Sequence, residues 1–403
     1  MKLKFDEITL DNGLKIIAEH NPNLETIAFG YFVNTGSRDE RSEISGVSHF
    51  LEHMMFKGTQ KRSPEDINRE FDEIGANYNA YTNKEHTVYY GAALREKSSE
   101  LIDILTDMMR PALRESDFDL EKNVILEEIA MYEDRPDFKV FDIGMEHFYN
   151  GHSLGNSVLG SSQSIKDLKI GQMRDYFEKR YASDNLYCVV AGNYNWDELI
   201  EQITKASSSW EIQNSLRSYP KLNFNNENKI IKDKKLNRSH VALFSEGLAA
   251  QDHKRYAAAI LSSLLGGSSG RLYWALTDKG LVDSASLSHD ISDRTGAFVG
   301  YISADPKELD NILDIYFDVL AKTDDITNDE WARAQRKIAS STMLRSETAF
   351  SRLMSLGRNY LYNRDYKTIN STVDKILNTK LAEAKEILES KPFENMSTII
   401  LSP

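Results

Sequence analysis

The chain has 403 residues, of which 40% are hydrophobic, and it carries a formal net charge of −13. This length accommodates two domains with real cores more comfortably than one. The acidic balance argues against nucleic acid as a partner, and no apolar run approaches the length of a membrane span, so we expect no nucleic-acid and no membrane partner.

The N-terminus runs directly into a hairpin-like start, Phe5–Ile17, with an Asn-Gly turn and without the apolar core of a signal peptide. The single cysteine, Cys188, lies in an apolar strand-like segment, so an internal disulfide is impossible and we interpret the thiol as a packing group. We expect a bacterial, cytoplasmic protein. The alternative is an organelle matrix after removal of a targeting segment.

The first motif with chemical content lies in the apolar, helix-like run Gly46–Gly58, which carries His49, Glu52 and His53. At i and i+4 the two imidazoles lie on one helical face, about one turn apart, and can share one metal ion. Glu52 projects from the same side, where a metal-activated water needs a carboxylate to accept its proton. His-x-x-Glu-His, the inverted counterpart of His-Glu-x-x-His, therefore predicts a zinc site with its own general base.

A helix at about 63–74 and a strand-rich segment at 76–94 follow. Thr82, Thr87 and Val88 favour strand in that segment. An extended peptide can pair with the edge of such a strand through backbone hydrogen bonds, which tolerate varied side chains. The alternative interpretation is an ordinary core strand.

Two histidines make an incomplete zinc site, so a third ligand is expected on a second rigid element. Residues 116–134 read as a long helix, with an N-capping serine at the start and a proline just beyond the end. Glu121 and Glu128 are seven residues apart and lie on one face, whereas Glu127 is rotated away. We assign Glu128 as the third ligand and Glu121 as the group that hydrogen-bonds a ligand imidazole or the water.

The order of elements roughly repeats in the second half of the chain. A strand at 240–244, a helix at 256–265, a strand-rich segment at 284–304 and a helix at 309–320 parallel the first half, but the first of these helices carries no metal ligand. The largely polar stretch around 223–235 reads as a linker. We predict two related α+β domains, 1–220 catalytic and zinc-binding and 221–403 without metal ligands, each a mixed β-sheet with helices mainly on one face.

These motifs together resemble the pitrilysin and mitochondrial processing peptidase family of inverted-motif zinc peptidases, in its short two-domain form. The residues that match the family's first block are Gly46, His49, Glu52, His53, Phe56, Gly58 and Thr59. Glu128 and Glu121 match its distant glutamates, and Asn79-Ala80-Tyr81-Thr82 matches its Asn-Ala-Tyr-Thr block. The resemblance implies one zinc ion per chain, substrate backbone bound by Asn79, Ala80 and Tyr81, and two such chains or halves facing across a closed chamber.

The second half departs from the family at one place. The family's arginine before a Gly-Leu turn and its tyrosine after that turn align with Thr277 and Asp283. Both groups help to hold substrate in related peptidases, so their loss leaves open how the substrate carbonyl is stabilised. Arg271 and Tyr273 lie nearby in the sequence and are our candidates for the replacement.

Two functions follow from these residues. The first is a zinc metalloendopeptidase that hydrolyses unfolded peptides or small proteins, with Glu52 as general base. The second is a non-catalytic or heterodimer-dependent subunit of a peptidase complex, which the missing arginine and tyrosine favour and the complete zinc motif opposes. Because one chain supplies half of the implied chamber, we predict a homodimer or a heterodimer with a related subunit.

Overall fold

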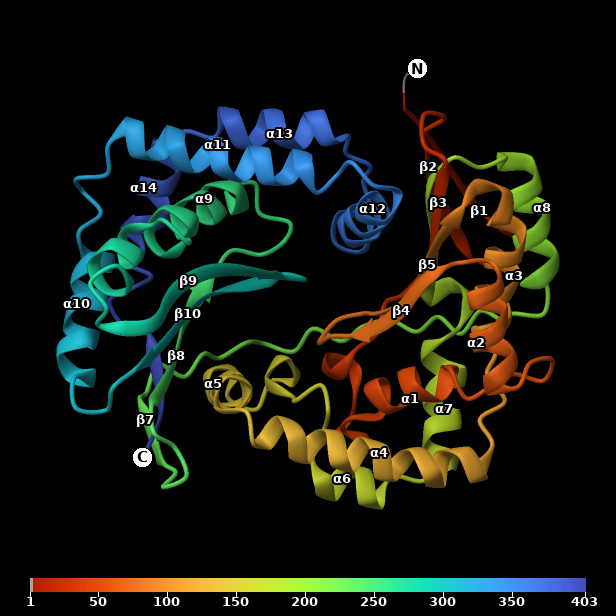
Figure 1. Ribbon diagram of the computed structural model, residues 1–403, viewed down its shortest axis with the longest axis horizontal. Helices are drawn as coiled ribbons and strands as arrows, with labels where there is room; N and C mark the ends of the chain where they lie inside the picture. The colour runs from red at the N-terminus through yellow and green to blue at the C-terminus, as the bar shows by residue number, and fades with distance from the viewer. Residues whose placement is uncertain (1–2) are drawn as a thin grey trace. The chain divides into compact units, whose positions relative to one another are not determined.

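The computed structural model describes residues 3–403, which form two compact units (Figure 1). Unit 1 consists of the described residues up to Ala130, Asn156–Pro220 and Arg345–Tyr366. Unit 2 consists of Met131–Gly155, Lys221–Leu344 and Lys367–Pro403. Among the helices of residues 3–403, none combines the length and the apolar run that crossing a bilayer requires.

Unit 1 is built on a six-stranded sheet with the order β1-β2-β6-β3-β5-β4. Only the β2–β6 pairing is parallel, so the sheet is mixed, and β4 is an edge strand that pairs with β5 alone. The strands are β1 Lys4–Thr9, β2 Lys15–His20, β3 Thr26–Val33, β4 Asn77–Thr82, β5 Thr87–Leu94 and β6 Leu186–Gly192. The helices of this unit are α1 Val47–Met55, α2 Pro64–Glu73, α3 Ser98–Met108, most of α4 Glu115–Glu133, α6 Ser162–Asp167, α7 Ile170–Arg180, α8 Trp196–Ala206 and α12 Ala349–Asn363.

The two faces of this sheet bury different helices. In β3, Phe29 and Tyr31 belong to the main core with α1 and α3, whereas the alternate residue Phe32 packs against α12. A Cβ at Gly357 in α12 would lie 2.3 Å from the Phe32 ring, so the helix needs a glycine there to approach the sheet. Most helices therefore cover one face, and α12, drawn in blue in Figure 1, covers the other.

Unit 2 repeats this plan on a five-stranded mixed sheet with the order β7-β11-β8-β10-β9. The strands are β7 Lys229–Lys232, β8 Ser239–Gly247, β9 Val282–Ser292, β10 Thr295–Ala304 and β11 Ser397–Ser402. The helices are α5 Pro136–Tyr149, α9 Arg255–Gly266, α10 Leu309–Ala321, α11 Asn328–Leu344, α13 Ile369–Asn378 and α14 Leu381–Glu389. In β8, Leu243 faces the main core of this unit and Phe244 faces α5, where a Cβ at Gly144 would lie 2.3 Å from the Phe244 ring.

The predicted fold class, two related α+β domains with mixed sheets and helices mainly on one face, is confirmed. The predicted ranges 1–220 and 221–403 need a correction, because the chain does pass from unit 1 to unit 2 after Pro220 but each half also lends a helix to the other unit. Helix α5 belongs to unit 2 and α12 to unit 1. The periodicity of an amphipathic helix identifies its apolar face but not the sheet that this face will cover, which is why the sequence did not reveal the exchange.

Candidate metal centre

The start of helix α1 is fixed by a glycine and a buried carboxylate. Gly46 has a φ of +91°, and a Cβ there would lie 2.5 Å from the carbonyl oxygen of Leu159, so no other residue fits. The carboxylate of Glu40 accepts hydrogen bonds from the backbone N–H groups of Gly46, at 2.7 Å, and Ser48, at 2.8 Å. These bonds satisfy two donors at the N-terminus of the helix that carries both predicted histidine ligands.

The structure brings His49, His53 and Glu128 together in unit 1. One potential ligand atom from each side chain lies within 4.8 Å of the others. Glu128 Oε2 is 3.7 Å from His49 Nε2 and 3.5 Å from His53 Nε2. Zinc bonds to nitrogen and oxygen ligands are about 2.0 to 2.2 Å long, so neighbouring ligands of a tetrahedral ion lie roughly 3.4 Å apart.

The three side chains therefore fit a zinc ion in both spacing and chemistry, since two imidazoles and one carboxylate are ordinary zinc ligands. Burial, with a smaller contribution from the charge of His53, lowers the pKa of His49 to about 3, which keeps its imidazole neutral and able to bind a metal. Among residues 3–403, this is the one group of three or more such side chains that can hold an ion.

Glu121 lies behind His53 rather than among the ligands. Its Oε1 is 2.8 Å from His53 Nδ1, and its Oε2 is 2.6 Å from the ammonium of Lys57. Burial raises the pKa of Glu121, but the bonds from His53 and Lys57 outweigh this effect and the pKa lies below its usual range. An ionised Glu121 holds the proton of His53 on Nδ1 and leaves Nε2 free to face Glu128.

Lys57 was not predicted, although it lies four residues after His53 and just beyond the end of α1. That spacing places it near the same side as His53, and this was the available signal. The other imidazole has no comparable support: Nδ1 of His49 is buried and makes no hydrogen bond within the described part of the chain. Packing alone therefore orients His49.

The predicted general base, Glu52, lies on the same side of α1 and is held by the edge strand. The hydroxyl of Thr82, the last residue of β4, donates to Glu52 Oε2 at 2.5 Å. Burial raises the pKa of Glu52, and the hydrogen bond from Thr82 partly offsets this effect. Thr82 belongs to the Asn79–Thr82 block that matches the family, but its contact with Glu52 was not predicted.

The predicted substrate-binding residues Asn79, Ala80 and Tyr81 lie on this same edge strand. Ala80 is part of the main core of unit 1, on the face that bears α1, while Tyr81 packs on the opposite face against the cluster that includes α12. The backbone N–H of Ala80 donates to Asn79 Oδ1 at 2.8 Å. The Tyr81 hydroxyl is 3.3 Å from His86 Nε2, so this side chain lies on the face of the sheet away from the metal residues.

Arg271 and Tyr273, the predicted replacements for the family's arginine and tyrosine, belong to unit 2. The guanidinium of Arg271 forms ion pairs with Asp325 at 2.6 Å and Glu330 at 3.0 Å. These carboxylates already bind the guanidinium N–H groups of Arg271 that a substrate carbonyl would need as hydrogen-bond donors. Tyr273 begins a short π-helical turn and lies edge-on to Trp274.

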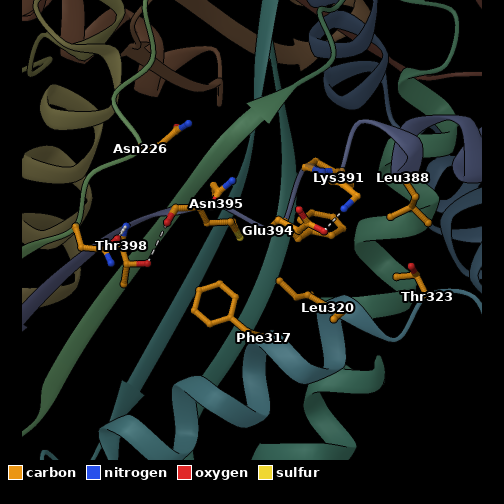
Figure 2. A pocket seen from close by; sticks show the side chains of 14 residues that line it. Asn226, Phe317, Leu320, Thr323, Leu388, Lys391, Glu394, Asn395 and Thr398 are labelled. Carbon is orange, nitrogen blue, oxygen red and sulfur yellow. Dashed lines mark hydrogen bonds and ion pairs between the residues drawn. The ribbon is translucent and has the colours of Figure 1, made fainter.

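Unit 2 also contains a cavity of about 510 Å³ that includes none of the predicted site residues (Figure 2). Phe317 and Leu320 of α10 form part of its apolar wall, and Lys391 and Glu394 contribute an ion pair of 2.6 Å. Lys391 and Glu394 neutralise each other in this ion pair, and none of the side chains that could bind the metal lines the cavity.

The fold and the site together define a class: a two-unit α+β protein with a His-x-x-Glu-His motif on one helix and a further glutamate at ligand spacing on another. Two family models match the chain: "Insulinase (Peptidase family M16)" over residues 15–162 and "Peptidase M16 inactive domain" over residues 167–338.

Proteins of similar sequence support the same family. The "Uncharacterized zinc protease YmxG" of Bacillus subtilis (strain 168) is 33% identical over 98% of this chain and 97% of its own length. A Streptomyces coelicolor protein, also named a zinc protease, is 31% identical over 95% of this chain and 87% of its own length. This chain belongs to the M16 peptidase family, as the resemblance to the pitrilysin group predicted.

A solved structure supports the fold independently. The crystal structure of a protease from Helicobacter pylori superposes with a TM-score of 0.91 over 100% of both chains at 20% sequence identity. At that identity the likeness speaks for the fold of the chain.

Proposed function

We propose that this protein is a zinc-dependent endopeptidase that hydrolyses unfolded peptides or small proteins. The observation that carries the proposal is the convergence of His49, His53 and Glu128 at ligand spacing, with Glu52 beside them on the same helix. The names of the relatives, which are zinc proteases, support the same metal and the same class of reaction.

Each residue has a distinct part in this proposal. His49, His53 and Glu128 hold the ion, and Glu121, supported by Lys57, orients His53. When bound, zinc supplies Lewis acidity toward the scissile carbonyl and makes an attacking water more acidic. Glu52 accepts the proton of that water on a carboxylate oxygen and delivers it to the leaving amine.

The peptide itself is held by the edge of β4. Within residues 3–403 this strand has no partner on its outer side, so an extended peptide can add to it as a further strand. Asn79 and Ala80 provide the backbone and amide groups for that pairing. The recognition of backbone rather than side chains suits varied, unfolded substrates.

We propose further that two chains assemble, as a homodimer or with a related subunit, to enclose the reaction in a chamber. The ion pairs of Arg271 with Asp325 and Glu330 support this assembly. Because Arg271 is not available to a substrate carbonyl, the groups that stabilise this carbonyl would come from the partner chain. The same observation favours the second candidate function, a subunit whose activity depends on a heterodimer partner. Size-exclusion chromatography with light scattering separates these cases: a persistent 46.0 kDa monomer would contradict the homodimer.

The decisive experiment compares the zinc-loaded chain with its Glu52→Gln variant on a quenched, unstructured peptide, with zinc content measured in both. The proposal expects cleavage by the parent and loss of cleavage in the variant at equal zinc. If both bind zinc and neither cleaves, the proposal of an independent peptidase is wrong and the subunit function takes its place.

A further inference from the structure

The contact between Thr82 and Glu52 joins two elements that the proposed function uses separately. Thr82 ends β4, and the register pairs it with Thr87 on β5. Its side chain projects on the same face as Ala80, which is the face that bears α1. The strand that offers its edge to a peptide therefore also reaches the helix that carries the base.

The proton of the Thr82 hydroxyl can be assigned from its neighbours. Two oxygens lie within reach: Glu52 Oε2 at 2.5 Å and Thr87 Oγ1 at 3.4 Å. An ionised carboxylate only accepts hydrogen bonds, and it is the closer and stronger acceptor. Thr87 gives its own proton to the carbonyl oxygen of Thr35 at 3.1 Å, so it has none to give to Thr82.

The hydroxyl donor is fixed in space, because β4 is paired with β5 along its whole length, from Asn77 to Thr82. Thr82 therefore holds the Glu52 carboxylate from a rigid element.

We propose that Thr82 is a positioning residue for Glu52, and this proposal rests on the proposed function. A glutamate side chain has several rotamers, and burial alone does not choose the one that directs an oxygen toward the water beside His49 and His53. The hydroxyl of Thr82 selects it. Because β4 also forms the edge to which the peptide adds, the base and the peptide are placed by the same strand.

Three variants test the proposal on the zinc-loaded chain with the quenched peptide: Thr82→Val, Thr82→Ser and the control Thr26→Val. Valine keeps the shape and the backbone N–H but removes the hydroxyl. We expect Thr82→Val to lower kcat by about 10- to 100-fold with KM and zinc content unchanged. Serine restores the hydroxyl, so we expect Thr82→Ser to recover most of the lost kcat. Thr26 begins β3, outside the site, and its replacement should leave kcat at the parental value.

Three outcomes would overturn the proposal: parental kcat in Thr82→Val, equal losses in the valine and serine variants, or a change confined to KM. Thermal unfolding and zinc content show whether the valine variant folds. If it does not fold, the kcat of Thr82→Ser and a crystal structure of the zinc-loaded parent decide whether Thr82 positions Glu52.

Failure of the proposed function remains distinguishable from failure of this inference. If the parent chain does not cleave, the proposed function is at fault, and a crystal structure of the zinc-loaded parent decides the role of Thr82. Glu52 within hydrogen-bond distance of the Thr82 hydroxyl supports it. A Glu52 carboxylate turned away from Thr82 overturns it.

Discussion

Arg352 of α12 and Glu19 of β2, residues 333 positions apart in the sequence, form a two-point ion pair inside unit 1. The Arg352 Nε–Glu19 Oε1 distance is 2.6 Å, and the two side chains are 7% and 2% exposed. Tyr366 donates a further hydrogen bond of 2.7 Å to the same carboxylate. The pair attaches the helix contributed by the second half of the chain to the sheet of the first.

Replacing Arg352 by methionine should destabilise unit 1 strongly. The change leaves the Glu19 carboxylate buried without its cation, and breaking a buried pair in this way costs about 3 to 5 kcal/mol. Urea unfolding of the parent and the variant at neutral pH measures the difference. Arg358→Met is the matched control, since Arg358 is exposed on the same helix and should change the free energy of unfolding little. Equal stability of Arg352→Met and the parent would contradict the prediction.

Replacing Lys57 by methionine should weaken zinc binding. The change removes the cation that pairs with Glu121, and Glu121 then orients His53 less firmly. Loss of such a supporting group typically costs about 10- to 100-fold in metal affinity or activity. Competition with a chelator of known affinity measures the dissociation constant. Lys61→Met, at a side chain 71% exposed, is the control; a variant at Lys57 that binds zinc as tightly as this control would refute the expected support.

Removing zinc should lower the stability of unit 1. A ligand that binds only the folded state stabilises it by about 2.7 kcal/mol when its free concentration is one hundred times the dissociation constant. Urea unfolding in a zinc buffer and in excess chelator measures this difference. Glu128→Gln should abolish the gain, whereas Glu127→Gln, at an exposed neighbouring position on α4, should retain it. An equal gain in both variants would exclude Glu128 as a ligand.

A pH effect on stability is expected from His289 in unit 2. Burial lowers the pKa of His289 to about 4, and its Nε2 accepts a hydrogen bond of 2.9 Å from the backbone N–H of Leu248. The unfolded chain binds the proton near pH 6.5, so it holds more protons than the folded chain between these values. The His289 contribution is therefore present above about pH 6.5 and is lost as the pH falls toward about 4.

Urea unfolding at pH 7 and pH 5 checks this expectation. In His289→Gln the amide oxygen can still accept the bond from Leu248 but does not titrate in this range, so the free energy of unfolding should fall less on acidification than in the parent. His253→Gln, at a side chain 82% exposed, should behave as the parent does. The same loss in all three proteins would assign the acid sensitivity to other groups.

The convergence of His49, His53 and Glu128 was predictable because the geometry within each helix is local. The spacing of four residues between His49 and His53 and of seven between Glu121 and Glu128 fixes which side chains share a helical face, whatever the rest of the fold does. The orientation of α1 relative to α4 is a tertiary property that local spacing does not determine. Two imidazoles and one carboxylate can share a metal ion only if these two helical faces meet, and this requirement made the orientation predictable.

The supporting contacts were not predictable in this way. The bond from Thr82 to Glu52 joins a strand to a helix across 30 positions of sequence, and a threonine hydroxyl in a strand gives no periodic signal. The exchange of α5 and α12 depends on which sheet each apolar face meets, which is decided by packing such as that of Gly357 against Phe32. Both features are settled by tertiary structure rather than by local pattern.

The exchange of α5 and α12 has a consequence for biosynthesis. The chain passes between the units at 130/131, 155/156, 220/221, 344/345 and 366/367, so the sheet of unit 1 acquires α12, the helix that covers its Phe32 face, only when residues 345–366 have left the ribosome. Until then the Phe32 face of that sheet lacks the helix that covers it. Unit 1, which brings His49, His53 and Glu128 together, therefore completes its core only after residues 221–344 of unit 2 have been synthesised, and such transiently exposed apolar surface is prone to aggregation.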